Sequence, residues 1–128
     1  MFRKKLLPVL LSSLWISLSE FVRNEFLLKN LWVSHYENLG LTFPSAPVNG
    51  ALWGIWSLLF ALAIFFLSRR FLLMQTALLS WLAGFVLMWV VIFNLGVLPL
   101  ESLLWAIPLS LLESFVATWI IVKVGGKG

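Results

Sequence analysis

The chain has 128 residues, of which 62% are hydrophobic and 11% charged, and its formal net charge is +4. A soluble domain is about half apolar and about one quarter charged, so we expect lipid to solvate a chain this short and this apolar. The absence of cysteine excludes disulfides, thiolate metal sites and cysteine nucleophiles. A single histidine excludes a multi-histidine metal site within one chain, and we expect neither a metal nor a cofactor.

Four segments of the chain are apolar enough to cross a membrane, which takes about 20 mostly apolar residues in a helix. They cover residues 6–32, 48–68, 71–95 and 98–124. The second and third segments are joined by a very short connection, so they should form an antiparallel hairpin. We therefore predict an all-α fold, with residues 1–128 forming a single membrane domain. Its architecture is that of a polytopic membrane protein, an antiparallel bundle of four transmembrane helices.

The first segment begins with a basic head, followed by an apolar stretch. A secretory signal has the same start, since small Ser17 and Ser19 follow the apolar residues. We favour a first span that is retained in the protein. Further along, the stretch "LSEFVRNEFLLKN" is unusually polar for this chain, because it contains Glu20, Arg23 and Asn24 as well as an expected ion pair between Glu25 and Lys29.

Small and polar residues recur in the first, second and fourth segments at the spacing i, i+4, i+7 and i+11, which marks one face of a helix, and the third segment has a shorter version of this pattern. In lipid, small residues permit close helix packing and polar residues form hydrogen bonds across helices, so these faces should point inward. The predicted inward faces are Ser13, Ser17, Glu20 and Asn24; Gly50, Gly54, Ser57 and Ala61; Thr76, Ser80 and Gly84; and Ala106, Ser110, Glu113 and Ala117. We expect Gly50, Gly54, Ser57 and Ser110 to line a pocket.

Glu113 is the charge that the sequence places deepest, with eleven uncharged residues before it and nine after it. A charge at the centre of a membrane helix costs about 2.5–3.5 kcal/mol, so it should find a partner. We predict a cluster of Glu20, Arg23 and Glu113, assisted by Asn24 and Asn94. Two carboxylates and one guanidinium leave an excess negative charge, so one carboxylate is expected to hold a proton. The cluster is then either a ligand, ion or proton site, or a structural staple.

Basic residues indicate the orientation of the helices. If four helices cross, one side receives Arg3, Lys4, Lys5, Arg69, Arg70, Lys123 and Lys127. This bias predicts that both termini are cytoplasmic and that the chain is a multi-pass protein of the cell inner membrane. The opposite side should hold a loop with His35, Tyr36 and Glu37, which are candidates for a polar site at the membrane surface.

The predicted function is that of a small membrane protein that binds or transports a small ligand or an ion, with proton coupling through Glu20 or Glu113. The alternative is a non-catalytic accessory or assembly protein whose buried charges act as a staple. Expected partners are membrane lipid, a small-molecule or ion ligand, and a second copy or another membrane protein. We expect no nucleic-acid partner, because the basic residues flank apolar segments. No catalytic motif occurs, so we expect no enzyme, although a lipid-active enzyme using His35, Glu37 and Glu101 stays open.

Overall fold

The structure is a computed structural model that describes residues 2–125, with side chains from Lys4 onward. The side chain of Arg3 and the whole of Lys127 lie outside the described residues. Within residues 2–125 every regular element is a helix, and no strand occurs. This confirms the predicted all-α fold.

Four runs of helix are long and apolar enough to cross a membrane: Lys4–Leu27, Pro47–Ser68, Leu73–Asn94 and Leu100–Gly125. The first contains η1 (Phe2–Leu6) from Lys4 onward, α1 (Leu7–Phe21) and η2 (Val22–Leu27), and the second is α3 (Pro47–Ser68). The third consists of α4 (Leu73–Trp81), η3 (Leu82–Val86) and α5 (Leu87–Asn94). The fourth consists of η4 (Leu100–Ser102) and α6 (Leu103–Gly125). The elements η1, η2 and η3 are π-helical turns, whereas η4 is a 3-10 turn.

The first helix differs from the predicted continuous helix over 6–32. It is interrupted at Leu28, where the backbone has φ −113° and ψ −3°, and α2 (Lys29–Asn38) follows. The Leu28 side chain is buried, which anchors the chain at this break. As a result, His35, Tyr36 and Glu37 lie on a helix and not in the predicted loop.

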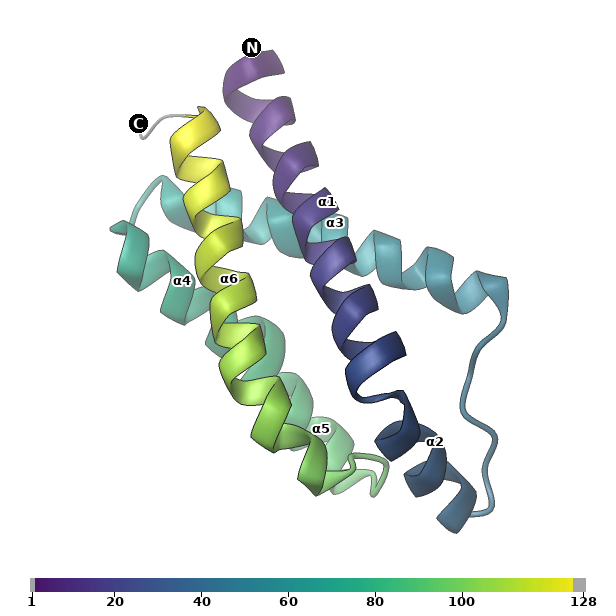
Figure 1. Cartoon of the computed structure of the whole chain (residues 1–128). Coiled ribbons are helices and arrows are strands. Elements are labelled where there is room, and N and C mark those ends of the chain that lie inside the picture. Colours follow the sequence, from purple (N-terminus) through teal and green to yellow (C-terminus); the bar gives the residue numbers. More distant parts are fainter. Residues whose placement is uncertain (1, 126–128) are drawn as a thin grey trace.

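The helices pack around a central pair. α1 contacts both α6 and α3, and α6 also contacts α4. Figure 1 shows α1 and α6 in front, with α3 crossing behind them at a steep inclination. The N-terminal half of α3 extends away from the other helices (Figure 1), and its buried residues begin only at Ser57. The packing is consistent with a bundle in which the second span is strongly tilted.

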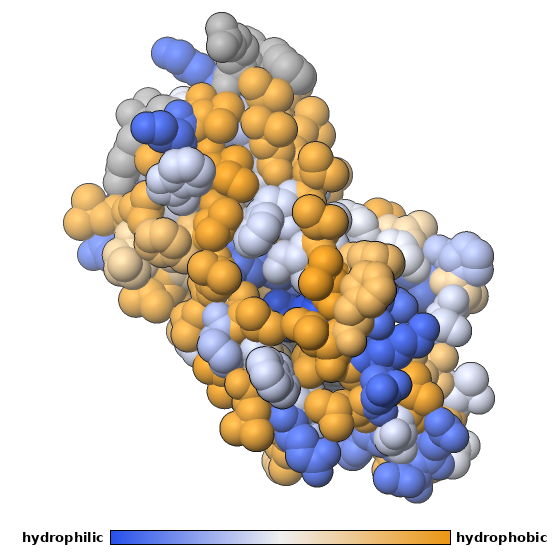
Figure 2. Space-filling view, viewed as in Figure 1, coloured by the Kyte–Doolittle hydropathy of each residue, from blue (hydrophilic) through white to orange (hydrophobic). Residues whose placement is uncertain are grey.

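One end of the molecule carries Lys4, Lys5, Arg69, Arg70 and Lys123, and we call it the basic end. The Arg69 guanidinium donates a hydrogen bond to the backbone oxygen of Lys4 at 3.4 Å, which joins the α3–α4 turn to the first span. We call the opposite end, with α2 and the connections 39–46 and 95–99, the loop end. In the space-filling view, hydrophilic side chains gather at the lower right, toward the loop end (Figure 2).

Large apolar side chains cover the outside of the spans, as the mainly orange surface in Figure 2 shows. Exposed fractions reach 80% at Leu104, 71% at Phe26 and 67% at Leu14. Contiguous exposed apolar surface of this extent is unusual on a soluble monomer. Together with the four long apolar helices, it identifies the chain as a membrane protein.

Gly84 allows the second and third spans to pack closely. A Cβ atom at this position would lie 2.5 Å from Cε1 of Phe60, which is closer than real Cβ atoms approach a neighbour. The Phe60 ring meets the Phe85 ring edge-on, with their centroids 5.5 Å apart. Glycine in η3 therefore makes room for an aromatic contact beside the buried charges.

Candidate functional site

Three buried charged side chains meet between the first and fourth spans. Nη1 of Arg23 donates a hydrogen bond to Oε1 of Glu113 at 3.2 Å, and Nη2 of Arg23 donates to Oε2 of Glu20. The three residues are buried, with exposed fractions of 5% for Arg23, 3% for Glu20 and 0% for Glu113. The predicted contact among these three residues, which we call the charged cluster, is therefore present. Its role as a ligand or proton site stays a prediction.

The buried face of α1 differs by one position from the predicted face. Ser12 and Ile16 are fully buried, whereas Ser13 and Ser17 are only partly buried. The hydroxyl of Ser12 donates a hydrogen bond to the backbone oxygen of Ala117 at 3.0 Å, which turns this side of α1 toward α6. Residues 12, 16, 20 and 23 then form one continuous buried face, which brings the Arg23 side chain to Glu113.

Two tryptophans donate hydrogen bonds to the cluster residues. Nε1 of Trp53 donates to Oε1 of Glu20 at 3.1 Å, and Nε1 of Trp15 donates to the backbone oxygen of Glu113 at 3.0 Å. An indole N–H needs a partner where lipid supplies none. Trp53 also precedes the buried Ser57 by four residues, and this spacing was the available signal that it faces inward.

The Arg23 guanidinium also lies over an aromatic ring, with its Cζ atom 5.4 Å from the ring centroid of Phe85. Arg23 belongs to η2 and Phe85 to η3, so two π-helical turns meet at this guanidinium. Single π-helical turns inside α-helices are frequent at functional sites. The sequence predicts neither turn, because no residue pattern marks them.

The charges of the cluster do not balance when both carboxylates are ionised. Glu20 and Glu113 share one guanidinium, which leaves one negative charge in excess. Among the described residues, Oε2 of Glu113 has no hydrogen-bond partner. An unpaired buried oxygen on a carboxylate is costly, so this atom is the chemically most unusual feature of the cluster.

The two asparagines do not join the cluster as predicted. Nδ2 of Asn24 donates to the backbone oxygen of Glu20 at 3.0 Å and not to its carboxylate. Asn24 follows Glu20 by one helical turn, and its side chain therefore reaches this backbone oxygen. Asn94 is exposed at the C-terminal end of α5, and no hydrogen bond within the described chain links it to the cluster.

The predicted pocket lining is also different in the structure. Gly50 and Gly54 are exposed, and a Cβ atom at either would meet nothing within 4 Å. The prediction that they face inward is wrong, because the steep tilt of α3 leaves residues 50–55 exposed, and α1 is reached there by the long Trp53 side chain. Ser57 and Ser110 are buried, but their hydroxyls already bond to neighbours: Ser57 to the Trp53 carbonyl, and Ser110 to the indole of Trp81 and the Ile107 carbonyl.

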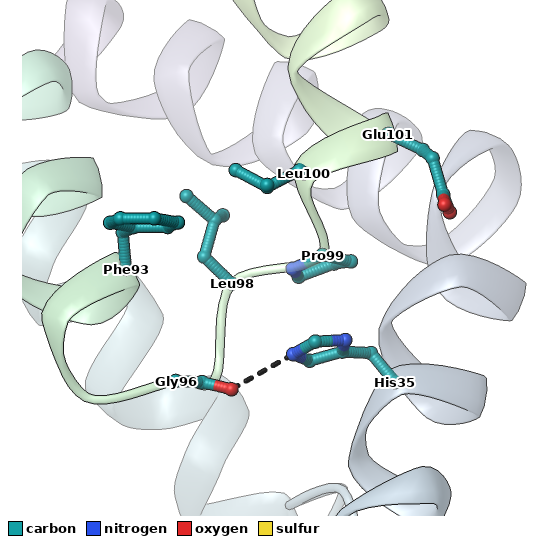
Figure 3. Close-up of a pocket in the computed structure, with 7 residues that line it drawn as sticks. All are labelled: His35, Phe93, Gly96, Leu98, Pro99, Leu100 and Glu101. Atoms are coloured by element: carbon teal, nitrogen blue, oxygen red, sulfur yellow. Dashed lines mark hydrogen bonds between the residues drawn. The ribbon is translucent and has the colours of Figure 1, made fainter.

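Two shallow depressions lie at the loop end, away from the cluster. The smaller has a volume of about 290 Å³ and is lined by His35, Phe93, Gly96, Leu98, Pro99, Leu100 and Glu101. Figure 3 shows the His35 ring pointing at the Gly96 carbonyl, to which Nε2 donates at 2.9 Å, while the Glu101 carboxylate points away from Phe93 and Leu98. The larger has a volume of about 400 Å³ and is lined by Lys29, Val33, Glu37, Leu41, Thr42, Phe43 and Ser45.

The three loop-end candidates are thus placed in different ways. His35 joins α2 to the 95–99 connection, and Glu37 lines the larger depression. The Tyr36 ring packs edge-on against the Phe43 ring, with centroids 5.1 Å apart. Among the residues that the structure describes, no group of three His, Cys, Asp or Glu side chains is arranged to hold a metal ion.

Comparison of the chain with protein-family models, with curated proteins and with solved structures gives no match.

Proposed function

We propose that the protein is a non-catalytic membrane protein whose charged cluster holds the spans together, and that it acts by binding another membrane protein. The enclosure of the cluster carries this proposal, since none of its three residues is more than 5% exposed. A site that exchanges a ligand with water or lipid needs an opening. Neither depression at the loop end is lined by a residue of the cluster.

The cluster touches every span, which suits a structural role. Arg23 and Glu20 come from the first span, Trp53 from the second, Phe85 from the third and Glu113 from the fourth. Lipid tails are as apolar as leucine, so apolar side chains do not by themselves select one helix arrangement over another. Buried polar contacts do, because each alternative arrangement leaves a charge or a donor unpaired.

The N-terminal half of α3 is the segment that we propose for contact with the partner. Residues 50–55 are all exposed, and Leu52, Trp53 and Ile55 have exposed fractions of 56%, 43% and 53%. Gly50 and Gly54 lie on this half without neighbours. In the proposed role a helix of the partner protein packs against this half, where the glycines permit close approach.

Photo-crosslinking in native membranes tests this role. A photoreactive amino acid replaces Leu52, which is 56% exposed on α3, in one variant and Met74, which is 55% exposed on α4, in a matched control. The proposal predicts a discrete adduct of one protein mass from position 52 and none from position 74. Only lipid adducts, or the same set of proteins from both positions, would exclude a specific partner at α3.

A second candidate function is the handling of a small ligand or a proton by the cluster. The unpaired Oε2 of Glu113 and the two π-helical turns favour it. Native mass spectrometry of the gently solubilised wild type beside Glu113→Gln separates the two candidates. A small molecule retained by the wild type and lost from the variant supports ligand handling, whereas two equally empty proteins support the structural role.

A further inference from the structure

Two oppositely charged side chains border the larger depression at the loop end. Lys29, Val33 and Glu37 line it from α2, and successive spacings of four residues place them along one helix face. The connection that follows α2 lines the other side. We call this depression, with its volume of about 400 Å³, the α2 groove.

Aromatic packing holds the wall of the groove in place. The Phe43 ring lies 6.0 Å from the Trp32 ring and 5.1 Å from the Tyr36 ring, measured between centroids. These contacts fasten the connection onto α2. The groove is therefore built between a helix and a segment packed against it.

The groove lies at the level of lipid headgroups. The first span ends at Leu27 and the second begins at Pro47, so every residue that lines the groove falls between two spans. Trp32 and Tyr36 beside it belong to the residue types that are enriched at the membrane–water interface. Phe26 and Leu27, which precede Lys29, are 71% and 53% exposed and offer an apolar surface to an acyl chain.

Both charges of the groove have capacity for a ligand. The Lys29 ammonium has three donors, of which one bonds to Glu25 at 3.2 Å, and its side chain is 46% exposed. Glu37 is exposed and forms no ion pair within residues 4–125. The smaller depression offers no such pair, because His35 already bonds to Gly96 and no Lys or Arg lines it (Figure 3).

We propose that the α2 groove binds the headgroup of a zwitterionic phospholipid, with the phosphate at Lys29 and the ammonium at Glu37. In such a lipid the phosphate adjoins the glycerol and the acyl chains, and the ammonium lies farther from the bilayer. Lys29 comes two residues after the end of the first span, and Glu37 lies about 12 Å farther along α2. Figure 1 shows α2 extending beyond α1, so the order of the two charges matches the order in the lipid.

The order of the charges also distinguishes a lipid from a soluble ligand. A free zwitterion such as glycerophosphoethanolamine turns round in the groove, whereas a lipid is held in one orientation by its acyl chains. Exchange of the two charges should therefore abolish lipid binding and leave binding of the free headgroup intact. Phosphatidylglycerol, an anionic lipid without an ammonium, brings no cation to Glu37 and should bind less well.

The test is lipid enrichment in nanodiscs that contain equal amounts of phosphatidylethanolamine and phosphatidylglycerol, read by native mass spectrometry of the full chain. The wild type should retain phosphatidylethanolamine, and Lys29→Gln and Glu37→Gln should each lower its enrichment by about twofold to fivefold. Glu101→Gln, an acidic side chain at the same end outside the groove, is the control and should retain the enrichment. The exchange combines Lys29→Glu with Glu37→Lys. It also contains Glu25→Gln, because Glu25 would repel a glutamate at position 29. The parent for comparison is Glu25→Gln alone.

Loss of enrichment in both single variants and in the exchange, with retention in the control, supports the proposal. It is overturned by no enrichment in the wild type, by equal enrichment in all variants, or by a dependence on Lys29 alone, which would indicate an anion site. Equal binding of lipid by the exchange and its parent would also overturn it. All substituted side chains are exposed, and circular dichroism checks that each variant keeps its helices.

Discussion

Arg23 and Glu113 are 90 positions apart in the chain, yet their side chains meet at 3.2 Å in a site that is closed to solvent. Arg23 stands on a π-helical turn at the end of the first span, and Glu113 stands near the middle of α6. In the proposed structural role, this contact selects which faces of the two helices meet. Most of the following predictions test what depends on it.

Removal of the guanidinium should be strongly destabilising. Arg23→Gln leaves both Glu20 and Glu113 buried without a cation, and loss of one partner from a buried ion pair costs about 3–5 kcal/mol. Reversible unfolding in bicelles measures the change in the free energy of unfolding. Lys29→Gln is the matched control, because its ion pair with Glu25 is exposed and should contribute at most about 1 kcal/mol.

Removal of one carboxylate should cost much less than removal of the guanidinium. Glu113→Gln keeps an oxygen that accepts from Arg23, while Arg23 retains Glu20, so one cation and one anion remain. We expect a loss of at most about 1 kcal/mol, since this change removes the excess negative charge. The same unfolding measurement checks the asymmetry. Equal losses of the free energy of unfolding for Glu113→Gln and Arg23→Gln would contradict the prediction that the cluster carries one excess negative charge.

Trp53 should stabilise the cluster through its indole N–H. Trp53→Phe keeps most of the apolar surface and removes the hydrogen bond to Glu20, which is worth about 1.5–3 kcal/mol for a charged acceptor. Trp105 is 58% exposed and forms no hydrogen bond within the described residues, so Trp105→Phe should change stability by less than about 0.5 kcal/mol. Similar effects of the two substitutions would place the contribution of Trp53 in its apolar contacts.

Gly84 should tolerate no larger side chain while Phe60 is present. The Cβ atom of Gly84→Ala would lie 2.5 Å from the Phe60 ring, and overpacking of this kind costs about 1–3 kcal/mol. Phe60→Leu in the same chain should recover part of the loss. Gly54→Ala meets open space and should be neutral or slightly stabilising, because alanine favours the helix. Thermal unfolding in detergent compares the three variants.

The four spans and the three-residue cluster could be predicted, because both depend on strong local signals. Long uncharged runs mark the spans, and a carboxylate such as Glu113, isolated within one of them, requires a partner. Arg23 was the available cation at a comparable depth. The inward face of α6 was also predicted correctly, since Ala106, Ser110, Glu113 and Ala117 are all buried.

The inward faces of the first and second spans depend on how the spans cross, which no local pattern contains. In α3 the predicted face continues through Gly50 and Gly54, but the steep crossing limits burial to its C-terminal half. Trp53, although 43% exposed, reaches the charged cluster with its indole N–H. The π-helical turns at η2 and η3 shift the register of each helix, and their residues are compatible with an ordinary α-helix.

A double-mutant cycle on Arg23→Gln and Glu113→Gln tests the central claim most directly. If the contact holds the first and fourth spans together, the double variant should lose less free energy of unfolding than the two single variants lose in sum. The expected difference is about 2 kcal/mol. The reason is that the second substitution removes one of the two carboxylates that the first leaves unpaired. Additive losses, within about 0.5 kcal/mol, would show that the two side chains do not interact and would contradict the account.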